Sequence, residues 1–388
     1  IAEEGVDLSQ LQAMLHQLEL SQREVGGDSY PYGLQLILHA LPGALHDGDP
    51  IALLDVDVAL KELEQEIQDP QFIPNLVKTW LLDNTHQVRL TMTPDTELAK
   101  QEEADEKAKL AAIQAGLSDS EKQAIIDQAL ALEARQEEID NPELLPEVTK
   151  DDIPAEINVI EGQSETIGAL PLSGYVCGTN GIVYEQVLVD LPELSEHEKA
   201  ILPLFNSCLT EVGSAGRDYL ETQSHQAAIS GGLSARSAIH AKIGSASDYH
   251  SHYILSSKAL ASNQQAMAEL IEDTLYTARF DEMSRLKDLV GQIRASVDHG
   301  ITGNGHGHAM MAATQNMTAA AKWKFDRSGF AGIQFVKQLN DQLKDESALD
   351  AFASDLKMIQ SKLCDAPKQG LLVADEHSYA ASMEGMTA

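Results

Sequence analysis

The chain has 388 residues, and its 61 acidic against 27 basic side chains give a formal net charge of -34. This length is enough for two or three domains with cores of their own. The acidic excess argues against phosphate-dominated binding of nucleic acid, in which Lys and Arg must displace counterions, and favours a cationic partner. Under the alternative interpretation, the acidity serves only to keep the protein in solution.

Three cysteines, at positions 177, 208 and 364, lie far apart and form no C-x-x-C pair. They indicate neither a disulfide framework nor a thiolate zinc site, and they fit a reducing compartment. No apolar run approaches the length of a membrane span, and no signal-peptide pattern opens the sequence. Because the chain begins at Ile1 within the approach to a helix, we expect a fragment whose parent can carry a targeting segment.

Residues 1 to about 96 are predicted to hold several helices and one strand. Leucines recur at helical spacing over residues 8–18, and residues 32–45 are apolar on nearly every side, which predicts a buried helix. Another helix is expected over residues 51–67. Residues 86–92 alternate with a period of two, which is typical of a half-buried strand. This piece has too few strands for its own sheet and is predicted to be the end of a domain.

A helical hairpin is predicted next. Residues 98–115 consist mainly of strong helix formers and end at Gly116, the residue best suited to a left-handed helix stop. Ser118 and Glu121 have the spacing of a capping box, which begins a second helix. With Pro94 before it, the hairpin is interpreted as a hinge, and the alternative is a solvated spacer. Prolines in residues 141–146 and 153–154 then predict an extended chain.

The remaining sequence predicts an α+β domain. Ser195 and Glu198 form another capping box, for a helix that reaches about residue 213. Strands are predicted over residues 157–160, 167–172, 181–191, 227–239, 249–257 and 370–373, and further helices over residues 264–277, 281–299, 308–324 and 349–363. This order of elements is typical of helices that cover one face of a sheet.

Candidate chemistry is sparse. His299, His306 and His308 form the one local histidine cluster, but no acidic or thiol third ligand has a recognisable spacing, so a flexible loop before a helix competes with a metal site. His250 and His252 are predicted to be a surface pair on one face of a strand. The glycine-rich segments 178–181 and 213–216 match neither a phosphate loop nor a dinucleotide fingerprint and indicate turns. Cys208 has no sign of a paired base, and nucleophilic catalysis has no support.

Several segments together carry a family resemblance, and they occur in this order: Tyr32-Gly33-Leu34, His46-Asp47-Gly48-Asp49-Pro50, Leu90-Thr91-Met92-Thr93-Pro94-Asp95, the hairpin, and Thr179-Asn180-Gly181-Ile182-Val183-Tyr184. Over nearly its whole length, the chain resembles the presequence-protease family of pitrilysin- and insulinase-type zinc metallopeptidases. The resemblance implies four related α+β domains, two in each half, and a long helical hairpin that joins the halves. The halves close around an unfolded peptide.

The resemblance also implies how this chain divides. Residues 1–96 are expected to be the C-terminal part of the second peptidase-like domain, and residues 97–155 the hinge hairpin. Residues 156–388 are expected to form the third, catalytically inactive domain, the peptidase-associated one, with an antiparallel-rich sheet covered by helices. The first and fourth domains, which carry the zinc site and the Arg and Tyr that assist the substrate carbonyl, would belong to the parent protein.

The family's H-x-x-E-H motif occurs nowhere in the sequence. By the resemblance, Leu204 and Cys208 stand at the two histidine positions and Ser207 at the glutamate position. Leucine offers no lone pair, and a site with three protein ligands does not tolerate that loss. We therefore expect no catalytic or zinc-binding residue in this chain, no cofactor of its own, and no activity of the chain alone.

The resulting hypothesis is a non-catalytic central fragment of a zinc metalloendopeptidase that degrades unfolded peptides such as targeting presequences. The fragment would form the hinge and part of the chamber wall. The alternative is a stand-alone protein-binding scaffold of the same fold. Expected partners are the missing first and fourth domains, unfolded basic peptides, and a second copy through exposed apolar faces, but neither nucleic acid nor a membrane. The bacterial cytoplasm is the expected compartment, with the mitochondrial matrix or another organelle as the alternative.

Overall fold

The computed structural model of the protein describes residues 1–26, 30–139, 141, 146–157 and 159–385. The chain divides into two compact units. Residues Ile1–Leu82 and Ile160–Ala388 form the larger one, and residues Asp83–Val159 form the smaller one.

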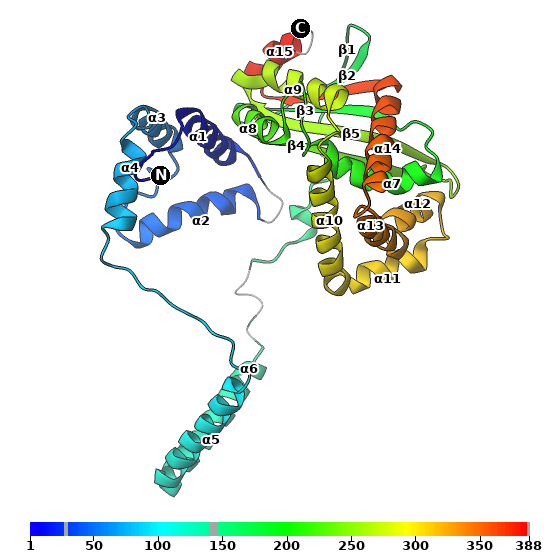
Figure 1. The fold of residues 1–388 in the computed structure, drawn as a ribbon. Coiled ribbons are helices and arrows are strands. Elements are labelled where there is room, and N and C mark those ends of the chain that lie inside the picture. Colours follow the sequence, from blue (N-terminus) through cyan, green and yellow to red (C-terminus); the bar gives the residue numbers. More distant parts are fainter. Residues whose placement is uncertain (27–29, 140, 142–145, 158, 386–388) are drawn as a thin grey trace. The chain divides into compact units, whose positions relative to one another are not determined.

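A six-stranded mixed sheet forms the centre of the larger unit (Figure 1). Its order is β1-β2-β6-β3-β5-β4, with the bounds β1 Gln163–Ile167, β2 Leu170–Val176, β3 Ile182–Asp190, β4 Leu233–Ala241, β5 Tyr249–Leu260 and β6 Lys368–Ala374. All neighbouring strands are antiparallel except β2 and β6, which are parallel. The α+β, antiparallel-rich fold predicted from the sequence is therefore confirmed.

Strand β3 lies in the interior of the sheet, which explains its long apolar run. It pairs with β6 on one side and with β5 on the other. Because side chains alternate along a strand, Val183, Glu185 and Val189 point to the buried face. Tyr184 and Gln186 point to the opposite face and are half-buried.

Four helices cover the buried face and complete one apolar core: α7 Glu196–Leu209, α9 Gln264–Thr277, α10 Met283–Gly303 and α14 Glu346–Asp365. Helix α7 begins at the predicted capping box, in which the Ser195 amide donates to Glu198 Oε2 at 2.7 Å. Phe205 of α7 is at the centre of this core. Its ring centroid lies 5.8 Å from those of Tyr253 and Phe280.

The described residues after position 160 form five more α-helices: α8 Tyr219–Ile229, α11 Gly305–Thr314, α12 Ala319–Ser328, α13 Phe330–Gln342 and α15 Glu376–Gly385. Two predictions were wrong here. The strand expected from residue 227 begins only at Leu233, because a capping box of Asp218 and Glu221 starts α8 before it. The helix expected over residues 308–324 is split, because the Thr318 hydroxyl accepts from the Ala321 amide and starts α12 anew.

The regular elements among the described residues of the segment 1–82 are helices: α1 Leu8–Arg23, α2 Tyr32–Leu45, α3 Val56–Glu66, α4 Phe72–Val77 and the π-helix η1 Lys78–Leu82. Helix α1 packs against α8. Gln17 Nε2 of α1 donates to the carbonyl oxygens of Ala227 and Ser230, and His16 Nε2 lies 3.1 Å from the Ile229 carbonyl oxygen. The helix expected over residues 51–67 is shorter in the structure, where α3 begins at Val56 and ends at Glu66.

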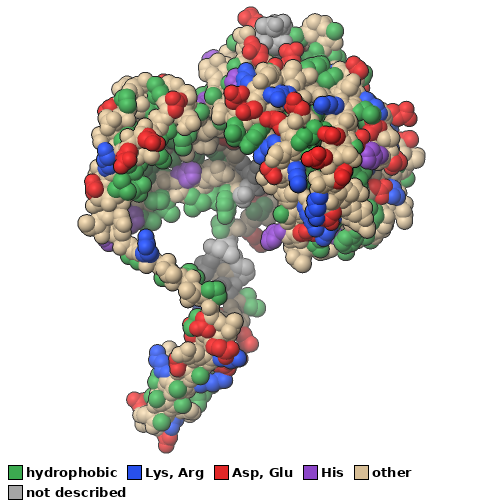
Figure 2. Space-filling model, in the orientation of Figure 1, with side chains coloured by type: hydrophobic (Ala, Val, Ile, Leu, Met, Phe, Trp, Pro, Cys, Tyr) green, Lys and Arg blue, Asp and Glu red, His purple; other side chains and the backbone are tan. Residues whose placement is uncertain are grey.

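Two predictions for the N-terminal segment were wrong. One concerned the burial of a helix, and the other concerned a predicted strand. Helix α2 has the expected bounds but no buried residue, and Figure 2 shows hydrophobic side chains gathered along it. Residues 86–92 are not a strand, and the side chains of Val88 and Leu90 are 91% and 79% exposed. A period of two makes a strand only where another strand pairs with it, and none of the described residues does so here.

The smaller unit contains the predicted hairpin, formed by α5 Leu98–Gly116 and α6 Asp119–Glu137. The capping box is confirmed: the Ser118 amide donates to Glu121 Oε2 at 2.8 Å. The left-handed helix stop predicted at Gly116 is wrong. Gly116 is the last residue of α5, and Leu117 leaves the helix with φ -80° and ψ 135°.

The strand predicted over residues 157–160 is wrong for residues 159–160, which form no strand. Residue 158 and most of the predicted extended segment 141–146 lie outside the described residues.

The link between α5 and α6 should be the least protected part of the hairpin. Gly116 and Ser118 are exposed and Leu117 is half-buried, whereas residues 183–188 lie in an interior strand. Amide exchange reports such local differences in stability. We expect hydrogen exchange, followed by mass spectrometry, to be faster at residues 116–118 than at residues 183–188. Equal protection would contradict the hinge hypothesis.

Candidate functional site

Helix α7 carries the three positions that the resemblance places at the metal-binding motif. Leu204 and Cys208 are 1% and 0% exposed and belong to the apolar core between the sheet and its helices. Ser207 is exposed, and its hydroxyl donates to the Pro203 carbonyl oxygen at 3.3 Å. The i, i+4 spacing on one face of α7 thus directs both ligand positions into the core.

These residues do not fit a catalytic zinc ion. Leu204 has no donor atom, and Ser207 donates its proton to the backbone of its own helix. Burial raises the pKa of the Cys208 thiol to about 12, so the thiol keeps its proton at neutral pH. A thiol binds zinc as the thiolate, which this environment disfavours.

The histidine cluster is not brought together as a site. His299 is exposed near the end of α10, His306 is exposed in α11, and His308 is 8% exposed with its ring 5.4 Å from that of Phe330. The flexible loop expected at these histidines is wrong, because only Asn304 separates α10 from α11. Helix α10 packs on α13, and helix α11 packs on α12. Within the described part of the chain, no three His, Cys, Asp or Glu side chains are grouped so that they could hold a metal ion.

The other predicted positions belong to segments of the chain other than α7. His252 Nε2 of β5 is 3.6 Å from Asp190 Oδ1, and His250 is exposed. The glycine-rich turns are confirmed, because Gly181 and Gly216 have φ angles of 81° and 80°.

The proposed hinge residues all lie in the smaller unit. The Ser118 amide donates a hydrogen bond to Glu121, Gly116 is the last residue of α5, and Pro94 lies before the first residue of α5. Their role as a hinge stays a prediction.

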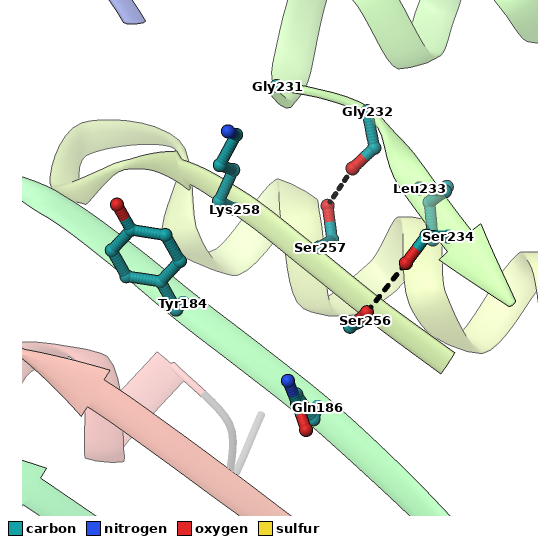
Figure 3. Close-up of a pocket in the computed structure, with 9 residues that line it drawn as sticks. All are labelled: Tyr184, Gln186, Gly231, Gly232, Leu233, Ser234, Ser256, Ser257 and Lys258. Carbon is teal, nitrogen blue, oxygen red and sulfur yellow. Dashed lines mark hydrogen bonds between the residues drawn. The ribbon is translucent and has the colours of Figure 1, made fainter. Parts of the chain in front are cut away.

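The face of the sheet opposite α7 carries a shallow polar pocket of about 330 Å³, drawn in Figure 3. Tyr184 and Gln186 of β3 line it together with residues of β5 and β4. The hydroxyl groups of Ser234 and Ser256 lie 2.8 Å apart across the two strands. Ser257 Oγ donates to the Gly232 carbonyl oxygen at 3.0 Å.

One lining residue connects this pocket to the N-terminal segment. Lys258 Nζ forms an ion pair with the carboxylate of Glu24, the residue that ends α1. Partial burial raises the pKa of the Tyr184 hydroxyl, and the charge of Glu24 adds to the effect. The pocket offers hydroxyl, amide and ammonium groups that can donate or accept hydrogen bonds. Sequence analysis missed it, although the serines at positions 234 and 256 are the signal of a polar sheet face.

Glu185 is a second residue that sequence analysis missed. It is 2% exposed within the apolar run of β3, and Gln264 Nε2 donates to its carboxylate. Burial raises the pKa of Glu185 to about 7, and the hydrogen bond from Gln264 opposes part of that rise. It borders a mainly apolar pocket of about 310 Å³ beside α9. A buried carboxyl group near neutral pKa makes the stability of this unit depend on pH.

None of the helices in the described part of the chain is long and apolar enough to cross a membrane.

Comparison with known proteins gives consistent similarities. A family profile described as the domain associated with subgroup C of the M16 peptidases matches residues 92–339. The "Presequence protease, mitochondrial" of Danio rerio is 31% identical over 337 residues, which cover 86% of this chain and 33% of that protein. "Presequence protease 1, chloroplastic/mitochondrial" of Arabidopsis thaliana is 27% identical over 371 residues, which cover 94% of this chain and 34% of that protein.

A bacterial relative, "Protein HypA" of Clostridium perfringens, is 23% identical over 365 residues, which cover 93% of this chain and 37% of that protein. The chain thus spans about a third of the length of the curated relatives it matches. Among solved structures, the "peptidase M16 inactive domain from Pseudomonas fluorescens" is similar with a TM-score of 0.38 and 12% identity, over 58% of this chain and 50% of that one.

Proposed function

This chain belongs to the family of domains associated with subgroup C of the M16 peptidases, and we propose that it forms a non-catalytic chamber wall and a hinge in a zinc metalloendopeptidase that degrades unfolded peptides such as targeting presequences. Helix α7 is the observation that carries the proposal. At the two ligand positions, Leu204 is buried and has no donor atom, and Cys208 is buried and keeps its proton. A domain of this kind can enclose a substrate but cannot activate water for its hydrolysis.

The hairpin supports the hinge part of the proposal. Its apolar side chains remain largely exposed, as Ile113, Ile125 and Leu130 do with 50%, 53% and 57% exposure. Self-packing of α5 and α6 therefore contributes little to their stability, and contacts with the rest of the protease would set the angle of the hairpin.

The sheet and α2 support the wall part of the proposal. The polar pocket of the open sheet face can form hydrogen bonds with an extended peptide. The exposed apolar side chains of α2 suit the missing domains of the parent protein, or a second copy of the chain. We further propose the bacterial cytoplasm as the compartment, with the mitochondrial matrix or another organelle as the alternative.

Peptide binding tests the proposal. A basic amphipathic peptide with an amidated C-terminus should bind weakly, because the net charge of -34 attracts it while half of the chamber is missing. Binding should fade above about 0.15 M salt, where the Debye length is about 8 Å. A matched acidic peptide amide should not bind. Fluorescence anisotropy at low and high salt measures both. Tight, salt-insensitive binding of either peptide would instead indicate the complete site of a stand-alone scaffold.

A further inference from the structure

A pocket of about 460 Å³ lies between α7, the edge strand β4 and α12. Three cationic side chains line it, Arg236 of β4 and Lys324 and Arg327 of α12, and no carboxylate is among its described lining residues. Acidic residues outnumber basic ones by 61 to 27 in this chain. Three cations around one pocket are therefore the opposite of what the composition favours.

Arg327 is the buried member of this group. Only 8% of it is exposed, its guanidinium carbon lies 3.0 Å from the centroid of the Trp323 ring, and its Nη1 donates to the Trp323 carbonyl oxygen at 2.6 Å. Its Nε has no hydrogen-bond partner among the described residues. Burial lowers the pKa of Arg327 to about 10, which leaves the side chain protonated at neutral pH. A buried charge of this kind is costly unless an anion compensates it.

Two acidic side chains compensate that charge only in part. Glu196 and Asp326 are close enough to raise the pKa of Arg327 against the effect of burial. However, Glu196 is paired with Lys199 at 2.7 Å, and Asp326 is paired with Lys322. Neither lysine lines the pocket. Arg236 and Lys324, which are exposed at its rim, form no ion pair within the described part of the chain.

The rest of the lining indicates what the anion is attached to. Ile239, Ala320 and Ala321 add apolar surface, and the Asn206 amide lies 3.2 Å from the Ser237 hydroxyl. The pocket opens beside β4, whose only neighbour among the described strands is β5. An extended chain end can therefore approach along this edge and place a small apolar side chain next to its terminal charge.

We propose that this pocket binds the C-terminal carboxylate of a peptide. The planar guanidinium of Arg327 matches a carboxylate in geometry, and Arg236 and Lys324 add charge at the rim. The inference rests on the proposed function and extends it, because it gives an unfolded basic peptide one anchored end. Inorganic phosphate offers the same oxyanion chemistry, and the experiment separates it from the peptide.

The test compares two forms of one basic amphipathic peptide that contains no Asp or Glu, one with a free C-terminal carboxylate and one with an amide. Anisotropy titrations with the full chain at about 0.15 M salt measure both affinities. We expect the free acid to bind at least about fivefold more tightly, since a charge-assisted hydrogen bond contributes on the order of 1 kcal/mol or more. Equal affinities would overturn the inference and leave the proposed function intact. No binding of either form at this salt would also overturn the inference, whereas the low-salt titration of the amide tests the proposed function separately.

Variants assign the difference to the pocket. Arg327→Gln should remove the preference for the free acid, and circular dichroism checks that the variant is folded. Lys324→Gln and Arg236→Gln change exposed side chains, so they should fold normally and reduce the preference about two- to threefold. Lys344→Gln is the matched control, because Lys344 is exposed, pairs with Asp341 at 3.3 Å and does not line the pocket, and it should keep the full preference. A preference that survives all three pocket variants, or phosphate that binds more tightly than the free acid, would overturn the assignment to a peptide terminus.

Discussion

Glu185→Gln should stabilise the protein by about 3 kcal/mol at pH 8 but by only about 1 kcal/mol or less at pH 5. The reason is the burial of the Glu185 carboxyl group in β3, which raises its pKa from 4.5 to about 7. Glutamine has the same shape and can still accept the hydrogen bond that Gln264 donates. It carries no charge that burial would penalise.

The sign follows from the two protonation states. Below pH 4.5, Glu185 is protonated in the folded and the unfolded chain, so it contributes no penalty. Between pH 4.5 and about 7, the folded state binds more protons, and stability falls as pH rises. Above pH 7 the penalty is complete. Lys368 lines the same pocket but donates to the carbonyl oxygens of Cys364 and Ala366, so it does not neutralise Glu185.

Thermal unfolding of the wild type and the variant at pH 5 and pH 8 measures the effect. The matched control is Glu269→Gln, because Glu269 lies on the exposed side of α9 at the same pocket and its charge remains hydrated. This control should shift the melting temperature little at either pH. A stabilisation by Glu185→Gln that is equal at both pH values would show that burial of the charge is not the cause.

Phe205→Ala should destabilise the larger unit by about 3–5 kcal/mol. The Phe205 side chain is fully buried and packs between Tyr253 of β5 and Phe280, which precedes α10. Truncation would leave a cavity between sheet and helices, with the lost contacts of a whole ring. For a unit of this size we expect the melting temperature to fall by roughly 10 °C.

The same substitution at an exposed phenylalanine provides the control. Phe330 begins α13 and is 50% exposed, so Phe330→Ala should cost about 1 kcal/mol or less. Chemical denaturation followed by circular dichroism compares the two variants. Similar losses of stability for both would mean that α7 does not carry the core of this unit.

Local sequence signals correctly predicted those elements that depend on residues close together in the sequence. The capping boxes at Ser118 and Ser195 need only a glutamate three residues later, and both helices begin where these pairs predict. The interior strand β3 shows itself as a run of Ile, Val, Tyr and Leu broken only by Glu185 and Gln186, and the sequence itself shows that no H-x-x-E-H motif occurs. The family resemblance rests on such segments and on their order.

Contacts between distant residues decided the rest. Helix α2 and residues 86–92 have the composition of buried elements, but the described chain provides no partner to bury them, so they stay exposed. The pKa of Glu185 depends on α9, which packs over it about 80 residues further along the chain. Arg236 and Arg327 are also far apart in sequence and line one pocket only because α12 lies beside β4. Periodicity and capping report local geometry, whereas burial, shifted pKa values and binding pockets arise from tertiary packing.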